Sequence, residues 1–107
     1  MPWNATLKER EESLVRLTKV TRAAEELTGL EAASYMNEAN PMTQHWREAW
    51  WGPHYEALLE TKRKYDPNRL LQCWKCVGFE DGDAESSRFR CSGKIQDQVY
   101  TELKETA

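Results

Sequence analysis

Aromatic side chains gather in one part of this chain. Four of its five tryptophans and three of its four tyrosines lie between residues 34 and 78 of 107. Each ring adds a large apolar surface that folding has to bury, and a chain of this length buries only a modest share of its surface. The aromatic run therefore predicts a surface that packs against something larger, or a small domain that buries its own rings.

Helical spacing is clear over residues 6–28. Apolar and small residues recur there at steps of three and four, which predicts an amphipathic helix. The expected apolar stripe consists of Leu7, Leu14, Leu17, Thr21, Ala24 and Leu27. Thr6 and Glu9 have the spacing of a capping box, and Gly29 is suited to end the helix.

A second helical segment is predicted over residues 43–65, with a break at Gly52-Pro53. Proline is tolerated in the first turn of a new helix, so the pattern favours two helices that meet at an angle. Asn40 or Thr43 could cap the first of them. Trp46, Ala49 and Trp50 share one face of this segment. Tyr55, Leu58, Leu59 and Lys62 continue that face.

Short extended segments are predicted on either side of that helical segment, at residues 33–37 and 70–77. Beyond Gly78 the composition becomes acidic and rich in small polar residues, which is typical of a loop. The last residues, "KIQDQVYTELKETA", could form a short helix with a thin apolar face. We therefore treat residues 79–107 as an acidic loop and variable tail.

The charge balance excludes several classes of partner. The net charge is -3, from 15 basic and 18 acidic residues, which argues against nucleic acid and against an anionic membrane surface. No apolar run approaches the roughly 20 residues of a membrane span. The first twelve residues have no apolar core of a signal peptide, so we expect no secretory signal there.

The three cysteines leave alternatives open. Cys73 and Cys76 have the spacing of a redox dithiol, or of half a zinc site completed by Cys91 and by His45 or His54. In a strand the first two side chains would point in different directions, so we favour structural thiols or one disulfide to Cys91, and no metal site.

One segment resembles a known family. "SYMNEA" followed by "HWREAWWGPHYEALLETKRKYDPNRLLQCWKCVG" is similar to the C-terminal segment of the berberine-bridge-enzyme-like, FAD-linked oxidoreductases, especially the fungal ones. The matching positions are Tyr35, Asn37, Glu38, Ala39, Trp46, Trp50, Trp51, Gly52, Tyr55, Leu58, Lys62, Tyr65, Asp66 and Pro67. His54 departs from the family pattern, which usually has Asn there.

The resemblance implies a helix-rich α+β fold for residues 1–78, in which the two extended segments are strand remnants of a larger substrate-domain sheet. It also implies FAD as cofactor. The family's FAD-binding domain is several times longer than this chain and has no counterpart in it. The resemblance thus implies the last portion of an oxidoreductase, from a truncated gene or a gene-model fragment, with no FAD bound to the isolated chain.

The resemblance also points to site residues. It implies that Asn37 and Tyr35 lie beside the flavin, with the Tyr35 phenol as the group that accepts a proton from a substrate alcohol. Trp74 and Cys76 are implied as more distant flavin neighbours. From the residues alone, a turn-capping Asn37 and a half-buried Tyr35 are the alternative, and Glu38 is a surface carboxylate.

Two functions follow. The first is the C-terminal part of an FAD-dependent enzyme that oxidises a small molecule, such as an alcohol, sugar or natural product, by hydride transfer to flavin. This chain alone is then expected to be inactive. The second is a non-enzymatic helical protein that binds a partner through its tryptophan face. Because the face from Trp46 to Tyr65 needs a partner, we also expect the isolated chain to self-associate.

Overall fold

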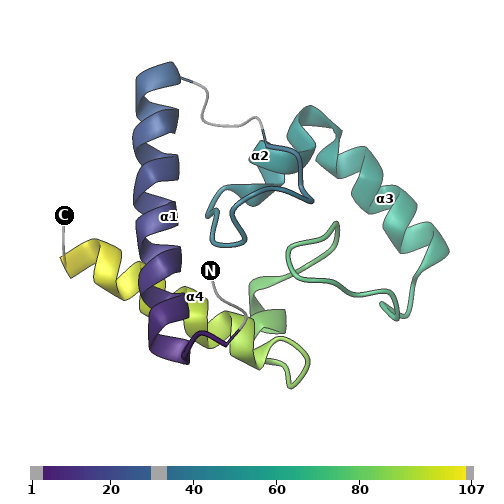
Figure 1. Ribbon diagram of the computed structural model, residues 1–107. Coiled ribbons are helices and arrows are strands. Elements are labelled where there is room, and N and C mark those ends of the chain that lie inside the picture. The colour runs from purple at the N-terminus through teal and green to yellow at the C-terminus, as the bar shows by residue number, and fades with distance from the viewer. Residues whose placement is uncertain (1–3, 30–33, 106–107) are drawn as a thin grey trace.

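The computed structural model describes residues 4–29 and 34–105 and is rich in helices (Figure 1). The elements in the described residues are α1 (Leu7–Thr28), α2 (Trp46–Trp51), the 3₁₀ helix η1 (Gly52–His54), α3 (Tyr55–Tyr65), the 3₁₀ helix η2 (Asp81–Glu85) and α4 (Arg90–Glu105). The helix-rich character, the long first helix and the break at Gly52-Pro53 are confirmed. No described helix is long and apolar enough to cross a membrane.

Helix α1 begins and ends where its local sequence predicts. The Glu9 amide donates to the Thr6 hydroxyl at 3.3 Å, and the Glu9 carboxylate accepts from the Thr6 amide at 2.7 Å. These hydrogen bonds complete the capping box, and the bond from the Thr6 amide is the main cause of the lowered pKa of Glu9. Gly29 ends the helix with φ 64°, in the left-handed region that glycine adopts without steric cost.

The buried face of α1 differs from the predicted stripe. Val15 and Thr18 are its buried residues, and Leu14 of the predicted stripe packs partly buried against the same core, whereas Leu7, Leu17 and Leu27 are exposed. Helix α4 packs on the face that carries Val15. Tertiary contact thus decides which side of α1 is covered, and the side with Leu17, Val20 and Leu27, called the leucine side below, remains exposed.

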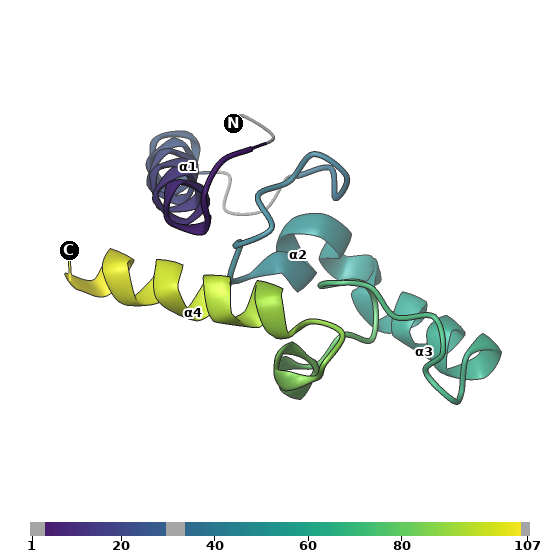
Figure 2. The ribbon, with the colours of Figure 1, turned by 60° about the horizontal axis from the view of Figure 1, so that its bottom comes forward.

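Helix α4 closes a first core together with α1. Val15, Met42, Val99 and Leu103 form a buried apolar cluster. Figures 1 and 2 show α4 crossing α1 near the beginning of that helix. A short terminal helix with a thin apolar face was expected here. The observed helix is 16 residues long and supplies two of the four buried side chains of this core.

The two segments predicted as strand remnants contain no strand in their described residues, 34–37 and 70–77. Each is folded by short-range turns. The Glu38 amide donates to the Tyr35 carbonyl at 2.9 Å, and the Phe79 amide donates to the Cys76 carbonyl at 2.9 Å. Strand-like residue types therefore indicated the wrong local structure here, because a strand also needs a neighbouring strand for its backbone hydrogen bonds.

Most of the aromatic run is covered from within. Trp46, Tyr55 and Phe79 form a second buried cluster, and Trp50, Trp51, Trp74 and Phe89 are partly buried against it. The ring centroids of Trp46 lie 5.8 Å from Tyr55 and 6.2 Å from Phe79, in edge-to-face arrangements. Part of this cover comes from Phe79 and Phe89, which belong to the segment expected to be a loop.

A turn at residues 40–43 joins the two clusters. The side chain of Asn40 accepts from the Met42 amide at 3.0 Å and donates to Thr18 of α1 at 3.0 Å. The Tyr100 hydroxyl of α4 donates to the Met42 carbonyl at 2.8 Å. Neither Asn40 nor Thr43 caps α2, whose N-cap residue is His45. These polar residues instead tie α1, α4 and the turn together.

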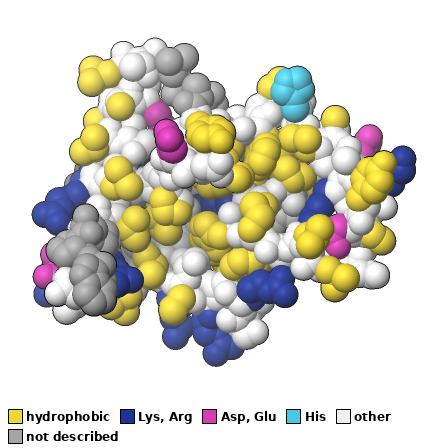
Figure 3. Space-filling view, turned by 45° about the vertical axis from the view of Figure 1, so that its right-hand side comes forward, with side chains coloured by type: hydrophobic (Ala, Val, Ile, Leu, Met, Phe, Trp, Pro, Cys, Tyr) yellow, Lys and Arg dark blue, Asp and Glu magenta, His cyan; other side chains and the backbone are white. Residues whose placement is uncertain are grey.

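Apolar side chains remain on the outside of α3 and of the loop that follows it. Leu58, Tyr65, Leu70 and Leu71 are exposed. Figure 3 shows apolar side chains gathering on one face of the molecule, between scattered Lys and Arg side chains. Self-association through the Trp46–Tyr65 face stays a prediction, and only part of that face is free for it.

We predict that Gly93→Ala destabilises the protein by about 1–3 kcal/mol, because overpacking a tight contact forces the backbone to shift. Gly93 is buried in α4, and a Cβ at this position would lie 2.5 Å from the Ala84 carbonyl oxygen. Gly82→Ala is the matched control, since no atom lies within 4 Å of its added Cβ. Urea unfolding measures both, and equal midpoints for the two variants would contradict the close approach of η2 to α4.

Candidate functional site

Tyr35 and Asn37 are brought together by a turn rather than by a strand. The Asn37 side-chain amide donates to the Tyr35 hydroxyl oxygen at 2.8 Å. Both side chains are exposed, and Tyr35 retains 68% of its accessible surface. The Ser34 amide donates to the Ala49 carbonyl at 3.1 Å, which ties this segment to α2. The pair is therefore positioned on the surface with its polar groups accessible.

Trp74 and Cys76 lie in the loop that follows α3. Trp74 packs edge-to-face on Phe79, with ring centroids 5.0 Å apart, and its indole nitrogen donates to the Pro41 carbonyl at 3.1 Å. No hydrogen bond or ring contact among the described residues joins this loop to Tyr35 or Asn37. The structure thus brings together two of the four predicted site residues, and it uses Trp74 as part of the aromatic cluster.

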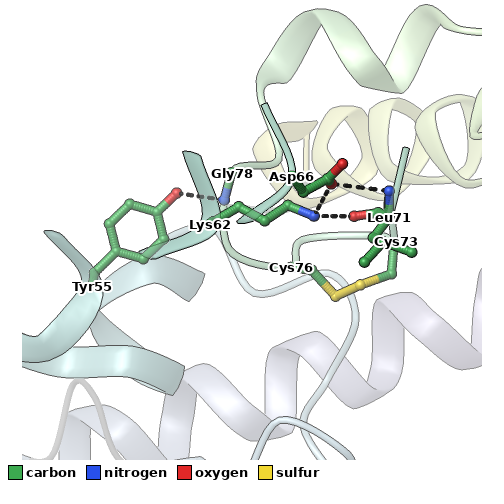
Figure 4. The surroundings of a disulfide bond; sticks show 7 residues. All are labelled: Tyr55, Lys62, Asp66, Leu71, Cys73, Cys76 and Gly78. Atoms are coloured by element: carbon green, nitrogen blue, oxygen red, sulfur yellow. Dashed lines mark hydrogen bonds and ion pairs between the residues drawn. A yellow bond between two sulfur atoms is a disulfide. The ribbon is translucent and has the colours of Figure 1, made fainter. Parts of the chain in front are cut away.

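The cysteine pairing differs from the predicted one. Cys73 forms a disulfide with Cys76, their Cα atoms 5.3 Å apart, and Cys91 is free and exposed (Figure 4). The Cys76 amide donates to the Cys73 carbonyl at 3.3 Å, so the chain turns between the two residues. In a turn both side chains can point to the same side, which a strand does not allow.

The zinc alternative lacks a set of ligands in the described part of the chain. No group of three or more His, Cys, Asp or Glu side chains there is arranged to hold a metal ion. Of the two histidines, His45 lies beside Glu25, with 3.6 Å between its Nε2 and the carboxylate oxygen.

Asp66 and Lys62 fasten the loop that carries the disulfide (Figure 4). The Lys62 ammonium bonds Asp66 Oδ2 at 2.5 Å and also donates to the Leu71 carbonyl. Asp66 in turn accepts the amides of Leu70 and Leu71 at 2.7 and 3.0 Å. The hydrogen bond from Lys62 is the main cause of the lowered pKa of Asp66. Asp66 is therefore a structural anchor as well as the end of α3.

Lys75 is a buried cation that the sequence analysis missed. Only 3% of its surface is accessible, and its ammonium donates to the Thr43 carbonyl at 2.7 Å. Burial lowers the pKa of Lys75 to about 8, with the charge of Asp81 acting in the opposite direction. The only sequence signal was a lysine inside an otherwise apolar loop, between two cysteines.

We predict that Lys75→Met raises the free energy of unfolding at pH 7 by about 2 kcal/mol. The folded pKa of about 8 lies below the unfolded value of 10.5, so the charge of Lys75 opposes folding by about 3 kcal/mol. Methionine removes this penalty but also loses the hydrogen bond to Thr43, which stabilises the fold by about 1 kcal/mol. The wild-type penalty is complete below pH 8 and disappears as the pH rises through about 10.5.

Urea unfolding at pH 7 and near pH 10 measures this difference, with Lys94→Met as control because Lys94 is exposed. The advantage of Lys75→Met over wild type should shrink at the higher pH. A difference that stays constant with pH would contradict the burial of a charged amine at this position.

Comparison with known proteins supports the sequence motif. The family model described as "Berberine and berberine like" matches residues 34–73. The FAD-linked oxidoreductase OXR2 of Pyricularia oryzae is 43% identical over 98 residues, which cover 88% of this chain and 17% of the relative. The FAD-linked oxidoreductase cheF of Chaetomium globosum is 42% identical over 101 residues, which cover 91% of this chain and 16% of the relative.

A third relative, the FAD-linked oxidoreductase ffsJ of Aspergillus flavipes, is 41% identical over 78 residues, with 73% of this chain and 12% of the relative covered. No solved structure is significantly similar to the chain. The chain spans less than a fifth of the length of these three relatives. Residues 34–73 thus match the berberine-like family model, and the chain is similar over most of its length to FAD-linked oxidoreductases of fungi.

Proposed function

We propose that this chain is the substrate-side segment of an FAD-linked oxidoreductase and contributes one wall of the site where a small molecule is oxidised. The observation that carries the proposal is the berberine-like segment at residues 34–73, which presents Tyr35 and Asn37 as an exposed, hydrogen-bonded pair. The relatives that cover most of this chain are all named FAD-linked oxidoreductases, which supports the same cofactor here.

The chemistry of the pair suits the edge of a flavin ring and a substrate hydroxyl. An amide side chain offers two donors and one acceptor, and Asn37 uses one donor on Tyr35. The Tyr35 oxygen accepts that bond and has a further lone pair for a substrate hydroxyl. In this proposal Asn37 orients Tyr35, and the deprotonated Tyr35 oxygen orients the substrate alcohol and takes its proton. Bound FAD would accept the hydride.

In this proposal Tyr35 and Asn37 meet one edge of the flavin. The pyrophosphate and adenine of FAD would be bound by a separate domain, so we expect the isolated chain to bind no FAD and to be inactive. An open apolar side of α1 fits this arrangement: Leu17, Val20 and Leu27 are exposed although helix α4 covers the opposite face. We propose that the rest of the enzyme packs on this leucine side.

The alternative, a non-enzymatic protein that binds a partner through its tryptophan face, has less support. Trp46 and Tyr55 are buried in the protein's own aromatic cluster and are not accessible to a partner. That face also offers a partner few hydrogen-bonding groups. The indole nitrogens of Trp50 and Trp51 are buried and have no hydrogen-bond partner among the described residues.

A hybrid enzyme tests the proposed function. This chain would replace the matching 98 residues of the FAD-linked oxidoreductase OXR2, and the flavin content of the purified hybrid would be compared with that of the parent. We expect the hybrid to keep stoichiometric flavin and the isolated chain to keep none. A folded hybrid without flavin would contradict the proposed role, and flavin on the isolated chain would contradict the need for a separate FAD-binding domain.

A further inference from the structure

A cleft of about 520 Å³ lies between the disulfide loop, α2 and α4, away from the Tyr35–Asn37 pair. Trp46, Lys75 and Phe79 are among its buried lining residues, at 2%, 3% and 3% exposed. Two aromatic residues and one lysine therefore form a buried part of its wall, which we call the floor. Its volume is in the range of small-molecule sites, which is about 300–1,000 Å³.

The ammonium of Lys75 is incompletely paired. It has three N–H donors, and the one hydrogen bond it makes to the described residues goes to the Thr43 carbonyl. None of the ion pairs among the described residues involves Lys75, and its other close neighbour is the ring of Trp74, 5.6 Å from the nitrogen to the centroid. A buried charge without a counter-ion is costly, so an anion bound here would be favoured.

No lining residue forms an ion pair with Lys75 among the described residues. The other charged residues of the cleft are the acidic Asp81, Glu85 and Asp97 and the basic Arg90 and Lys94, all of them exposed. The rim therefore carries one more negative than positive charge, and water screens these exposed charges. Asp81 acts on Lys75 only at longer range, without an ion pair. The buried positive charge of the cleft thus lies below a weakly negative, solvent-screened rim.

The geometry of Lys75 is fixed by the backbone around it. Lys75 has φ 54°, in the left-handed region that is uncommon for residues other than glycine. The adjacent disulfide, Cys73–Cys76, closes the turn on both sides of it, and the indole nitrogen of Trp74 is bonded to the Pro41 carbonyl. The loop therefore fixes the position of Lys75 before a ligand binds.

We propose that this cleft is a second binding site, which takes a small aromatic carboxylate. The carboxylate would accept hydrogen bonds from the Lys75 ammonium, and the ring would lie against the apolar floor at Trp46 and Phe79. A charge-assisted hydrogen bond to a buried cation is stronger than one between neutral groups, so the ligand's carboxylate is the group recognised. The site requires no flavin and does not depend on the proposed oxidoreductase function.

Titration of the 107-residue chain with benzoate tests the proposal, with benzyl alcohol as the uncharged ligand of similar size. Calorimetry and ligand-observed NMR report the affinity. We expect benzoate to bind at least tenfold more tightly than benzyl alcohol, which corresponds to about 1.4 kcal/mol for the carboxylate. Equal affinities, or no benzoate binding at millimolar concentrations, would overturn the proposal.

Two lysine variants locate the site. Lys75→Met should lower the benzoate affinity at least tenfold, whereas Lys94→Met, at the exposed rim of the same cleft, should change it less than about threefold. Lys75→Arg keeps the charge and should retain most of the binding, which guards against a fold defect in Lys75→Met. Unchanged benzoate binding by folded Lys75→Met would overturn the assignment to this cleft.

Discussion

Trp46→Ala is expected to lower the free energy of unfolding by about 3–5 kcal/mol, because it removes a large ring from a closely packed cluster. Trp46 is 2% exposed, and its ring centroid lies within about 6 Å of those of Trp50, Tyr55 and Phe79. The Arg47 guanidinium lies 4.4 Å from the same ring. A small domain has only about 5–15 kcal/mol of stability, so this variant should be close to unfolded at 37 °C.

Tyr65→Ala is the control for that experiment. Tyr65 belongs to the same aromatic run but is exposed, so the substitution should change the free energy of unfolding by less than about 0.5 kcal/mol. Urea unfolding followed by circular dichroism measures both variants. Similar losses for the two would contradict the internal aromatic cluster and would favour a run that is exposed as a whole.

Val99→Asp is expected to separate α4 from α1. Val99 has no accessible surface and packs with Val15, Met42 and Leu103. An aspartate at this position would be a buried charge without a partner, which costs at least about 3 kcal/mol. The helix content should fall, because α1 has a narrow covered face and a helix in a protein owes most of its stability to tertiary packing.

Thr101→Asp places the same charge two residues further along α4, at an exposed position. It should cost less than about 1 kcal/mol, including repulsion with nearby acidic side chains. Both variants introduce an aspartate into α4, and they differ only in whether it lies on the buried or on the exposed face of that helix. Equal loss of helix in both variants would contradict the packing of α4 on α1.

Local rules predicted those parts of the fold that depend on neighbouring residues. The Thr6–Glu9 capping box, the end of α1 at Gly29 and the break at Gly52-Pro53 all rest on contacts within a few positions. Helical periodicity located α1 and the pair of helices around the break for the same reason. Local preference and global fold agree at these positions, which is why they can be predicted from neighbouring residues.

Features set by long-range contact were missed or misassigned. The leucines of α1 indicated a covered face, but the partner that selects the covered face is α4, about eighty residues away in sequence. The residue types of the disulfide loop indicated a strand, whereas Asp66 and Lys62 hold that loop by its backbone. The spacing of Cys73 and Cys76 allows their pairing, but the strand expected there favoured Cys91 as the partner instead.

Some residues of the candidate site could be predicted from the sequence, and others depend on long-range contacts. Tyr35 and Asn37 were assigned through the family resemblance, and the structure places them in contact, although on a turn rather than a strand. Lys75 was missed because a lysine in an apolar segment carries no sign of burial until Thr43 and the rings of the cluster surround it. Its role depends on contacts between residues more than thirty positions apart.

The visible absorption spectrum of flavin bound to the OXR2 hybrid tests the central claim, that Asn37 and Tyr35 lie beside the flavin. The hybrid would be compared with its Asn37→Ala variant and with Thr101→Ala, an exposed position on α4. Flavin absorption responds to hydrogen bonds at the ring edge, so Asn37→Ala should shift the bands and Thr101→Ala should leave them unchanged. Identical spectra for all three flavin-loaded proteins would contradict the placement of this segment against the flavin.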